Sequence, residues 1–230
     1  MKKILLASTL ALCVTSAFAA DPSAVLNVKG TLTNAACTPE LGNGGVVDYG
    51  FIRLGELSAT EVNQIGQKNI DLKINCTSDT KVGFSISDDR YSSKVSSIKI
   101  DKAYFDGTTT TNSSNNFGAG VTADNVKIGS WALSAKTDSI TADGNAVDFI
   151  QSLGYAEVSD MVWTSNATKG VIAPTGQVYT AAASGTLEPV AFKTATFPLV
   201  TTLAIQDTTT LAITDDTPVD GQATITLRYL

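Results

Sequence analysis

The chain has 230 residues, of which only 17% are charged, and its 16 basic residues are outnumbered by 22 acidic ones. The resulting net charge of −6 argues against nucleic acid or an anionic membrane as a partner bound through a basic face. Histidine is absent, which excludes Ser-His and Cys-His nucleophile pairs and the commonest general base at neutral pH. We therefore expect a protein that is not an enzyme and uses no cofactor.

The N-terminal residues have the pattern of a secretory signal peptide. Two lysines are followed by an apolar run and then by a small-residue site that ends at Ala19. We expect cleavage between Ala19 and Ala20, which leaves a signal peptide over residues 1–19 and a single domain over residues 20–230. Because the apolar run is too short to cross a bilayer, we expect an exported protein, in the periplasm or at the cell surface, with no membrane insertion after cleavage.

Two cysteines, Cys37 and Cys76, remain once the signal peptide is removed. In an oxidising compartment we expect them to form a disulfide. Closing the loop of 39 residues between them restricts the unfolded chain by roughly 4 kcal/mol in the entropy model. A redox or metal-binding role is the alternative, but the chain has no C-x-x-C spacing and no histidine to complete a zinc site. We expect no metal.

Alternating apolar residues predict many short strands. In chain order they cover Val25–Asn34, Val46–Phe51, Ile70–Cys76, Val82–Ile86, Lys127–Leu133, Asn145–Ile150, Gln177–Ala181, Val190–Phe192, Thr196–Val200 and Leu203–Ile205. The Thr/Ser/Asn-rich stretch from Asp106 to Asn116 predicts a long surface loop, and only Asp148–Tyr155 has a weak helical pattern. Many short strands with almost no helical periodicity predict an all-β fold, a single β-sandwich.

Two kinds of candidate site are weak. The carboxylate pairs Asp88-Asp89 and Asp215-Asp216 lie in polar, turn-like stretches, where solvation explains them better than acid–base chemistry. Trp131 and Trp163 are candidates for a sugar-stacking platform, but core packing is the favoured interpretation.

The last ten residues form a strictly alternating strand. Ala223, Ile225, Leu227 and Tyr229 lie on one face, and the opposite face is polar. One interpretation is an ordinary closing strand of an all-β domain. The other is an edge that pairs with a strand from another chain, because the free N–H and C=O groups of an exposed strand recruit a partner.

Several short motifs together resemble the pilin subunits of chaperone–usher fimbriae. They are Lys29-Gly-Thr-Leu-Thr-Asn-Ala-Ala-Cys37, Val47-Asp-Tyr-Gly50, Leu54-Gly55, a strand that ends in Cys76, and the penultimate Tyr229. Over nearly the whole mature length the chain is similar to a group of fimbria-like exported proteins of enteric bacteria, which includes the one encoded beside glutamate synthase. The stretches that carry this similarity include Gly44–Gly50, Asn75-Cys-Thr77, Gly185–Val190 and Thr196-Phe-Pro-Leu199.

This resemblance implies an immunoglobulin-like, pilin-type sandwich with one groove left open. A periplasmic chaperone, and then another fimbrial subunit delivered through an usher, would fill that groove with a strand. The function expected is a non-enzymatic fimbrial-like structural or adhesion component. A stand-alone, self-complemented periplasmic binding protein is the alternative, and a secreted hydrolase ranks third because no nucleophile and base can be named.

The mature N-terminus departs from the pilin pattern. If the first strand begins near Val25, only Ala20–Ala24 is free, which spans about 17 Å at roughly 3.4 Å per residue. Asp21 and Pro22 also interrupt its apolar alternation. We therefore expect a poor strand donor.

Overall fold

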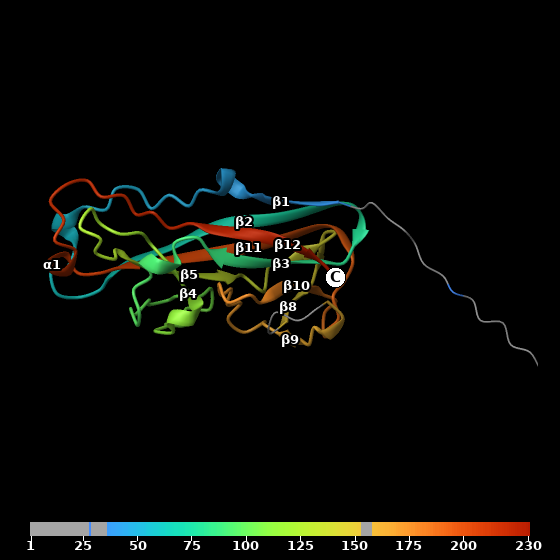
Figure 1. Ribbon diagram of the computed structural model, residues 1–230. Coiled ribbons are helices and arrows are strands. Elements are labelled where there is room, and N and C mark those ends of the chain that lie inside the picture. The colour runs from blue at the N-terminus through green and yellow to red at the C-terminus, as the bar shows by residue number, and fades with distance from the viewer. Residues whose placement is uncertain (1–27, 29–35, 153–157) are drawn as a thin grey trace, which may run out of the picture. The chain divides into compact units, whose positions relative to one another are not determined.

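Strands dominate the computed structural model, which describes residue 28, residues 36–152 and residues 158–230 (Figure 1). The predicted signal peptide, its cleavage site at Ala19 and Ala20 and almost all of the predicted strand Val25–Asn34 lie outside the described residues. Residues 34–230 form one compact unit, and every strand described below belongs to it.

The strands form two antiparallel sheets. The first sheet contains, in spatial order, β1 (Cys37–Leu41), β2 (Asn63–Thr80), β11 (Phe192–Ile205), β5 (Gly129–Ala135) and β4 (Asn116–Gly118), with β6 (Thr141–Ala142) beside β11 and β7 (Asn145–Ala146) beside β6. The second contains β12 (Ala223–Tyr229), β3 (Val82–Asp88), β10 (Val178–Ala182), β8 (Asp148–Ser152) and β9 (Trp163–Ser165).

Helical structure in the described ranges is limited to short turns. One α-helix, α1, covers Thr208–Leu211. Asp207 caps its N-terminus, because the Asp207 carboxylate accepts the Thr210 N–H at 2.8 Å. The 3-10 turns are η1 (Gly42–Gly45), η2 (Leu54–Glu56), η3 (Tyr91–Ser93), η4 (Ser113–Asn115) and η5 (Val158–Asp160). The expected all-β fold is therefore confirmed at the level of two sheets.

The core lies between the two sheets. Alternate residues of β2, namely Ile70, Leu72 and Ile74, are buried there, as period-two alternation requires. They meet an aromatic group from both sheets, in which the rings of Phe84 and Phe197 lie 5.2 Å apart edge to face. Burial of these large apolar side chains is the main stabilising contribution to the sandwich-like packing.

The predicted disulfide between Cys37 and Cys76 is confirmed. Their sulfur atoms lie 2.05 Å apart, and the two residues are direct partners in the register of β1 and β2. Ala36 C=O accepts the Thr77 N–H at 3.0 Å, so Ala36 and Thr77 form a hydrogen-bonded pair. Hydrogen-bonded and non-hydrogen-bonded pairs alternate along an antiparallel ladder, so the next pair, Cys37 and Cys76, has no ladder hydrogen bonds. Such pairs bring two strands closest together, and the Cα atoms here are 4.0 Å apart. The disulfide thus fastens β1 to the end of β2.

Most of the predicted strands are present, but three strands predicted separately lie in or beside a single strand, β11. Val190–Phe192, Thr196–Val200 and Leu203–Ile205 fall in or beside the continuous strand β11. Pro198, inside the predicted strand Thr196–Val200, is accommodated because β5 pairs with β11 from Leu199 onward and β6 pairs with it at residues 195 and 196. The missing N–H of Pro198 therefore falls in the gap between two partner strands.

Two local predictions are wrong. Val46–Phe51 is not a ladder strand, because among the described residues it has no strand partner and Gly50 takes a left-handed φ of 71°. The described part of Asp148–Tyr155 is not helical but forms β8, which pairs with β10. The predicted loop from Asp106 to Asn116 is largely confirmed, since it contains only η4 and one isolated bridge at Thr110.

Residues 95–105 cover the outer face of the first sheet. Polar side chains of the sheet hold the backbone of this segment: Gln67 Nε2 donates to Lys102 C=O at 2.6 Å, and Ser134 Oγ accepts the Phe105 N–H at 2.9 Å. Apolar residues of the segment pack between these bonds, including Ile98, Ile100 and Tyr104. On the opposite face of the same strands, Leu133, Leu199 and Leu203 line the groove described next.

Candidate functional site: an apolar groove beside the C-terminal strand

An apolar groove of about 770 Å³ lies between residues 45–54 and residues 213–225. Its lining comes from both sheets. The apolar side chains that line it from the strands are Leu41, Ile70, Ile86, Trp131, Leu133, Leu199, Leu203, Ala223 and Ile225. This groove is where the hydrophobic core is not covered by a strand of the described chain.

Strand β12 forms one flank of the groove. Its side chains alternate as predicted, with Ala223, Ile225 and Leu227 half-buried and the threonines between them exposed. The backbone alternates too: Leu230 N–H donates to Lys81 C=O, and Gln222 C=O accepts the Asp89 N–H, both at 3.0 Å. Because Gln222 and Leu230 both bond across the pair and bonded residues alternate, the even-numbered residues of β12 make the ladder hydrogen bonds to β3.

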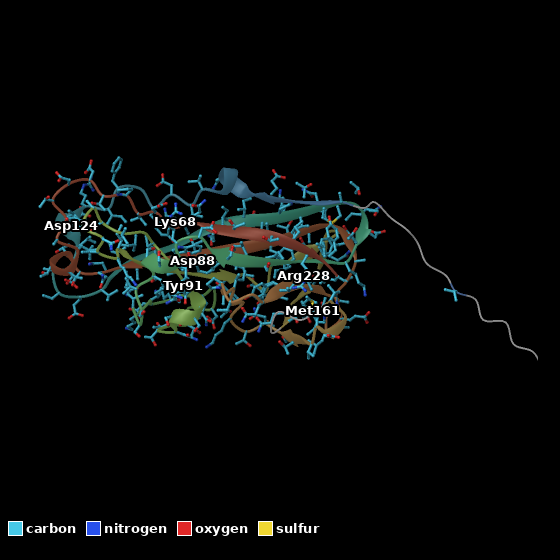
Figure 2. The ribbon with its side chains drawn as sticks, viewed as in Figure 1. Lys68, Asp88, Tyr91, Asp124, Met161 and Arg228 are labelled. Carbon is cyan, nitrogen blue, oxygen red and sulfur yellow. A yellow bond between two sulfur atoms is a disulfide. The ribbon has the colours of Figure 1, made fainter. Side chains whose placement is uncertain are left out.

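The odd-numbered residues of β12 therefore point their N–H and C=O groups away from β3. These are Ala223, Ile225, Leu227 and Tyr229, the residues predicted to form a pairing edge. In the described chain no strand pairs with β12 on that side, since β12 is the last strand of its sheet. Figure 2 labels Asp88 and Arg228, which lie towards opposite ends of the β3–β12 pair.

Residues 46–53 form the other flank. Val46 and Arg53 have extended backbone angles, and no ladder joins this segment to either sheet as described. Tyr49 turns inward, where its hydroxyl lies 2.9 Å from Thr201 Oγ1, and burial raises the pKa of Tyr49 to about 12, with the hydrogen bond to Thr201 opposing that rise. Phe51 is 100% exposed and lies on the rim of the groove.

The two ends of the groove differ. At the disulfide end β1 approaches β12, and Cys37 N–H donates to Tyr229 Oη at 2.9 Å. At the other end Trp131 stacks on Phe117, with ring centroids 4.2 Å apart. Gly221 packs against that indole so closely that a Cβ there would lie 2.7 Å from Trp131 Nε1.

The first predicted carboxylate pair anchors the start of β12. Asp89 accepts the Thr224 hydroxyl at 2.8 Å, and Asp88 accepts the N–H groups of Arg90 and Gly118 at 2.8 and 2.9 Å. Burial raises the pKa of Asp88, and these backbone hydrogen bonds oppose the rise. Arg90 in turn binds Asp220 through two nitrogen–oxygen contacts of 2.8 and 3.2 Å. Hydrogen bonding in a turn accounts for this pair.

The other candidates are dispersed. Asp215 and Asp216 lie in an exposed loop on the rim of the groove. Trp131 lines the groove, whereas Trp163 lies on β9 at the far edge of the second sheet, so they form no joint platform. Neither a group of three or more potential metal-ligating side chains nor a helix able to cross a membrane is found in the described residues.

Several groove residues carried no sequence signal of a site. Ile70, Ile86 and Leu199 read only as core residues of their strands. Tyr49 stood in the motif Val47-Asp-Tyr-Gly50, and the glycine in that motif was the available hint of an interrupted strand.

Comparison with known proteins places the chain in a family. It is 30% identical over 242 residues to Protein GltF of Escherichia coli (strain K12), with 97% of this chain and 95% of GltF covered. The chain belongs to the GltF family. Its identity to the Uncharacterized protein YhcF of the same strain is 30% over 243 residues, with 99% of this chain and 98% of YhcF covered.

Residues 26–132 also match the family described as "Protein of unknown function (DUF1120)". No solved structure matches the chain. Neither relative's name states a fimbrial role.

Proposed function

We propose that this member of the GltF family is an exported, non-enzymatic fimbrial-like protein, a structural or adhesion component that is assembled by β-strand complementation. The observation that carries the proposal is the apolar groove with a backbone edge on each side that has no ladder partner in the described chain. A free strand edge beside an apolar groove is an aggregation hazard that natural proteins normally cover.

A strand laid in the groove would satisfy both flanks at once. Its alternate apolar side chains would cover the groove lining, and its backbone would pair with the outward groups of Ile225 and Leu227 on β12. Residues 46–53 would offer the second edge. This arrangement supports an immunoglobulin-like sandwich of pilin type, with a periplasmic chaperone, an usher and other fimbrial subunits as the partners.

The second candidate function is a stand-alone periplasmic binding protein. A volume of about 770 Å³ falls in the range of small-molecule clefts, and Tyr49 and Thr201 place hydroxyl groups in its wall. In that case the protein completes its own sandwich or takes a small apolar ligand. The first candidate is favoured because the free edge of β12 is suited to a polypeptide backbone, which a small ligand does not need.

Capture of a synthetic strand tests the proposal. A fluorescent peptide with alternating apolar residues is mixed with the purified protein, and stable binding is followed by anisotropy and by elution together on a sizing column. We expect slow, stable capture. Refusal of every such peptide by folded protein would contradict the proposal and favour self-completion.

A matched pair of variants locates the binding. Ile225→Ala shortens a half-buried groove side chain, and we expect affinity to fall about tenfold, the factor that corresponds to roughly 1.4 kcal/mol. Thr226→Ala changes the exposed face of the same strand and should leave capture unchanged. Growth of long, heat-resistant homopolymers without added peptide would contradict the expectation of a poor strand donor.

A further inference from the structure

The charge of the groove wall points to the chemistry of its occupant. Resting on the proposed function, we propose that the strand that fills the groove is a basic segment of a different protein, with alternating apolar residues, and not a second copy of this chain.

The charged residues that line the groove are all acidic. They are Asp48 on one flank and Asp215 and Asp216 on the other. None of these three belongs to an ion pair found within the described residues. Asp48 also borders a neighbouring hollow that contains Lys68, which is labelled in Figure 2, so its charge is partly offset. The uncompensated negative charge of the groove wall therefore comes mainly from Asp215 and Asp216.

The position of these two carboxylates determines which part of a bound strand they meet. In an extended strand, side chains that enter the groove alternate with side chains that face solvent. The first set contacts the apolar lining, whereas the second set lies level with the exposed rim where Asp215 and Asp216 stand. Lysine or arginine at the solvent-facing positions is thus attracted by the rim, and aspartate or glutamate is repelled.

This chain is a poor source of such a strand. The side chains of residues 20–35 include one acidic residue, Asp21, and one basic residue, Lys29, so they contribute no net positive charge. Without Lys2 and Lys3 the chain retains 14 basic against 22 acidic residues, and two copies repel each other at long range. Charge complementarity therefore favours a foreign basic segment over self-association.

The experiment measures how fast two synthetic strands bind to the purified protein. The peptides share alternating leucine and valine residues and differ only in carrying lysine or glutamate at the intervening positions. At low salt we expect the lysine peptide to associate about tenfold faster, with the difference shrinking at high salt as screening increases. A third peptide with the sequence of residues 20–35 should associate more slowly than the lysine peptide.

Variants separate the rim charges from the overall charge of the protein. Asp215→Asn with Asp216→Asn should lower the preference for the lysine peptide at least threefold, whereas Asp79→Asn with Asp138→Asn, an equal charge change outside the groove lining, should keep it. Equal rates for both peptides, or fastest capture of the peptide from residues 20–35, would overturn this inference while leaving strand capture intact. Capture of no peptide would overturn the proposed function as well.

Discussion

Strands β1 and β12 both contribute residues to the groove, but their outer edges are built differently. The hydrogen bond from Thr77 N–H to Ala36 C=O fixes the parity of β1, so the backbone nitrogens of residues 37, 39 and 41 face away from β2. The Cys37 N–H is used by Tyr229 Oη, and Pro39 has no N–H to offer. This edge is blunted in the way natural edge strands usually are.

The outer edge of β12 carries no such protection. Its outward-facing residues Ala223, Ile225 and Leu227 include no proline and no charged side chain. The same residues also turn their side chains toward the apolar interior. The fold therefore protects the outer edge of β1 and leaves the outer edge of β12 available, where the core lacks a covering strand.

Deleting Ala223–Leu230 removes β12 altogether and should have the largest effect on the fold. We expect no stable folded protein, because Val82, Phe84 and Ile86 of β3 would lose their cover and β3 would become a new edge. Yield of folded protein and thermal unfolding followed by circular dichroism provide the measurement. Normal yield with an unchanged melting temperature would show that β12 contributes little to the fold.

Replacing both disulfide cysteines removes the covalent bond that holds the protected edge strand β1 to β2. Cys37→Ser with Cys76→Ser should lower the free energy of unfolding by about 2–4 kcal/mol, because the loop of 39 residues between them is no longer closed in the unfolded chain. Urea unfolding gives the value, and the unmutated protein under reducing conditions is the control that should match it. Equal stability of the variant and the oxidised protein would be the contrary result.

The sequence was sufficient for the features that depend on local pattern. Alternation placed β2, β3 and β12 and the inward face of Ile225 and Leu227, and cysteine count with the expected export predicted the disulfide. Each of these follows from period two or from pairing chemistry, with no need for long-range geometry.

The features that the sequence did not predict depend on which strands become neighbours. Val46–Phe51 alternates like a strand, yet no strand pairs with it among the described residues. The three strands predicted from Val190 to Ile205 fall in or beside one continuous strand, β11, which pairs with β2 along its length. The groove itself is formed by residues far apart in the chain, such as Ile70 and Leu199, and their local sequence resembles any buried strand.

Gly221→Ala tests how the start of β12 is positioned. The added Cβ would lie 2.7 Å from Trp131 Nε1 and 3.3 Å from Gly118 C=O, so the indole or the strand must shift. We expect a loss of about 1–3 kcal/mol in the free energy of unfolding by urea, the range for overpacking a close contact. Gly55→Ala is the matched control, since nothing lies within 4 Å of its Cβ, and an equal effect of both changes would contradict the contact.

Tyr229→Phe is the smallest change and the sharpest test of the protected edge. It removes the hydroxyl that accepts the Cys37 N–H, and leaves the ring and the β12 ladder in place. Because Tyr229 is 49% exposed, water can replace the lost acceptor, and we expect a loss of only about 0.5–1 kcal/mol in the free energy of unfolding. Hydrogen exchange reports the change more directly.

The Cys37 amide should exchange faster in this variant, while the amides of β12 that bond to β3 keep their protection. Tyr91→Phe, on another exposed tyrosine, is the control and should alter neither stability nor exchange at Cys37. If Cys37 exchange stays as slow in Tyr229→Phe as in the control, the tyrosine does not protect the edge of β1. The contrast with β12 would then rest on Pro39 alone.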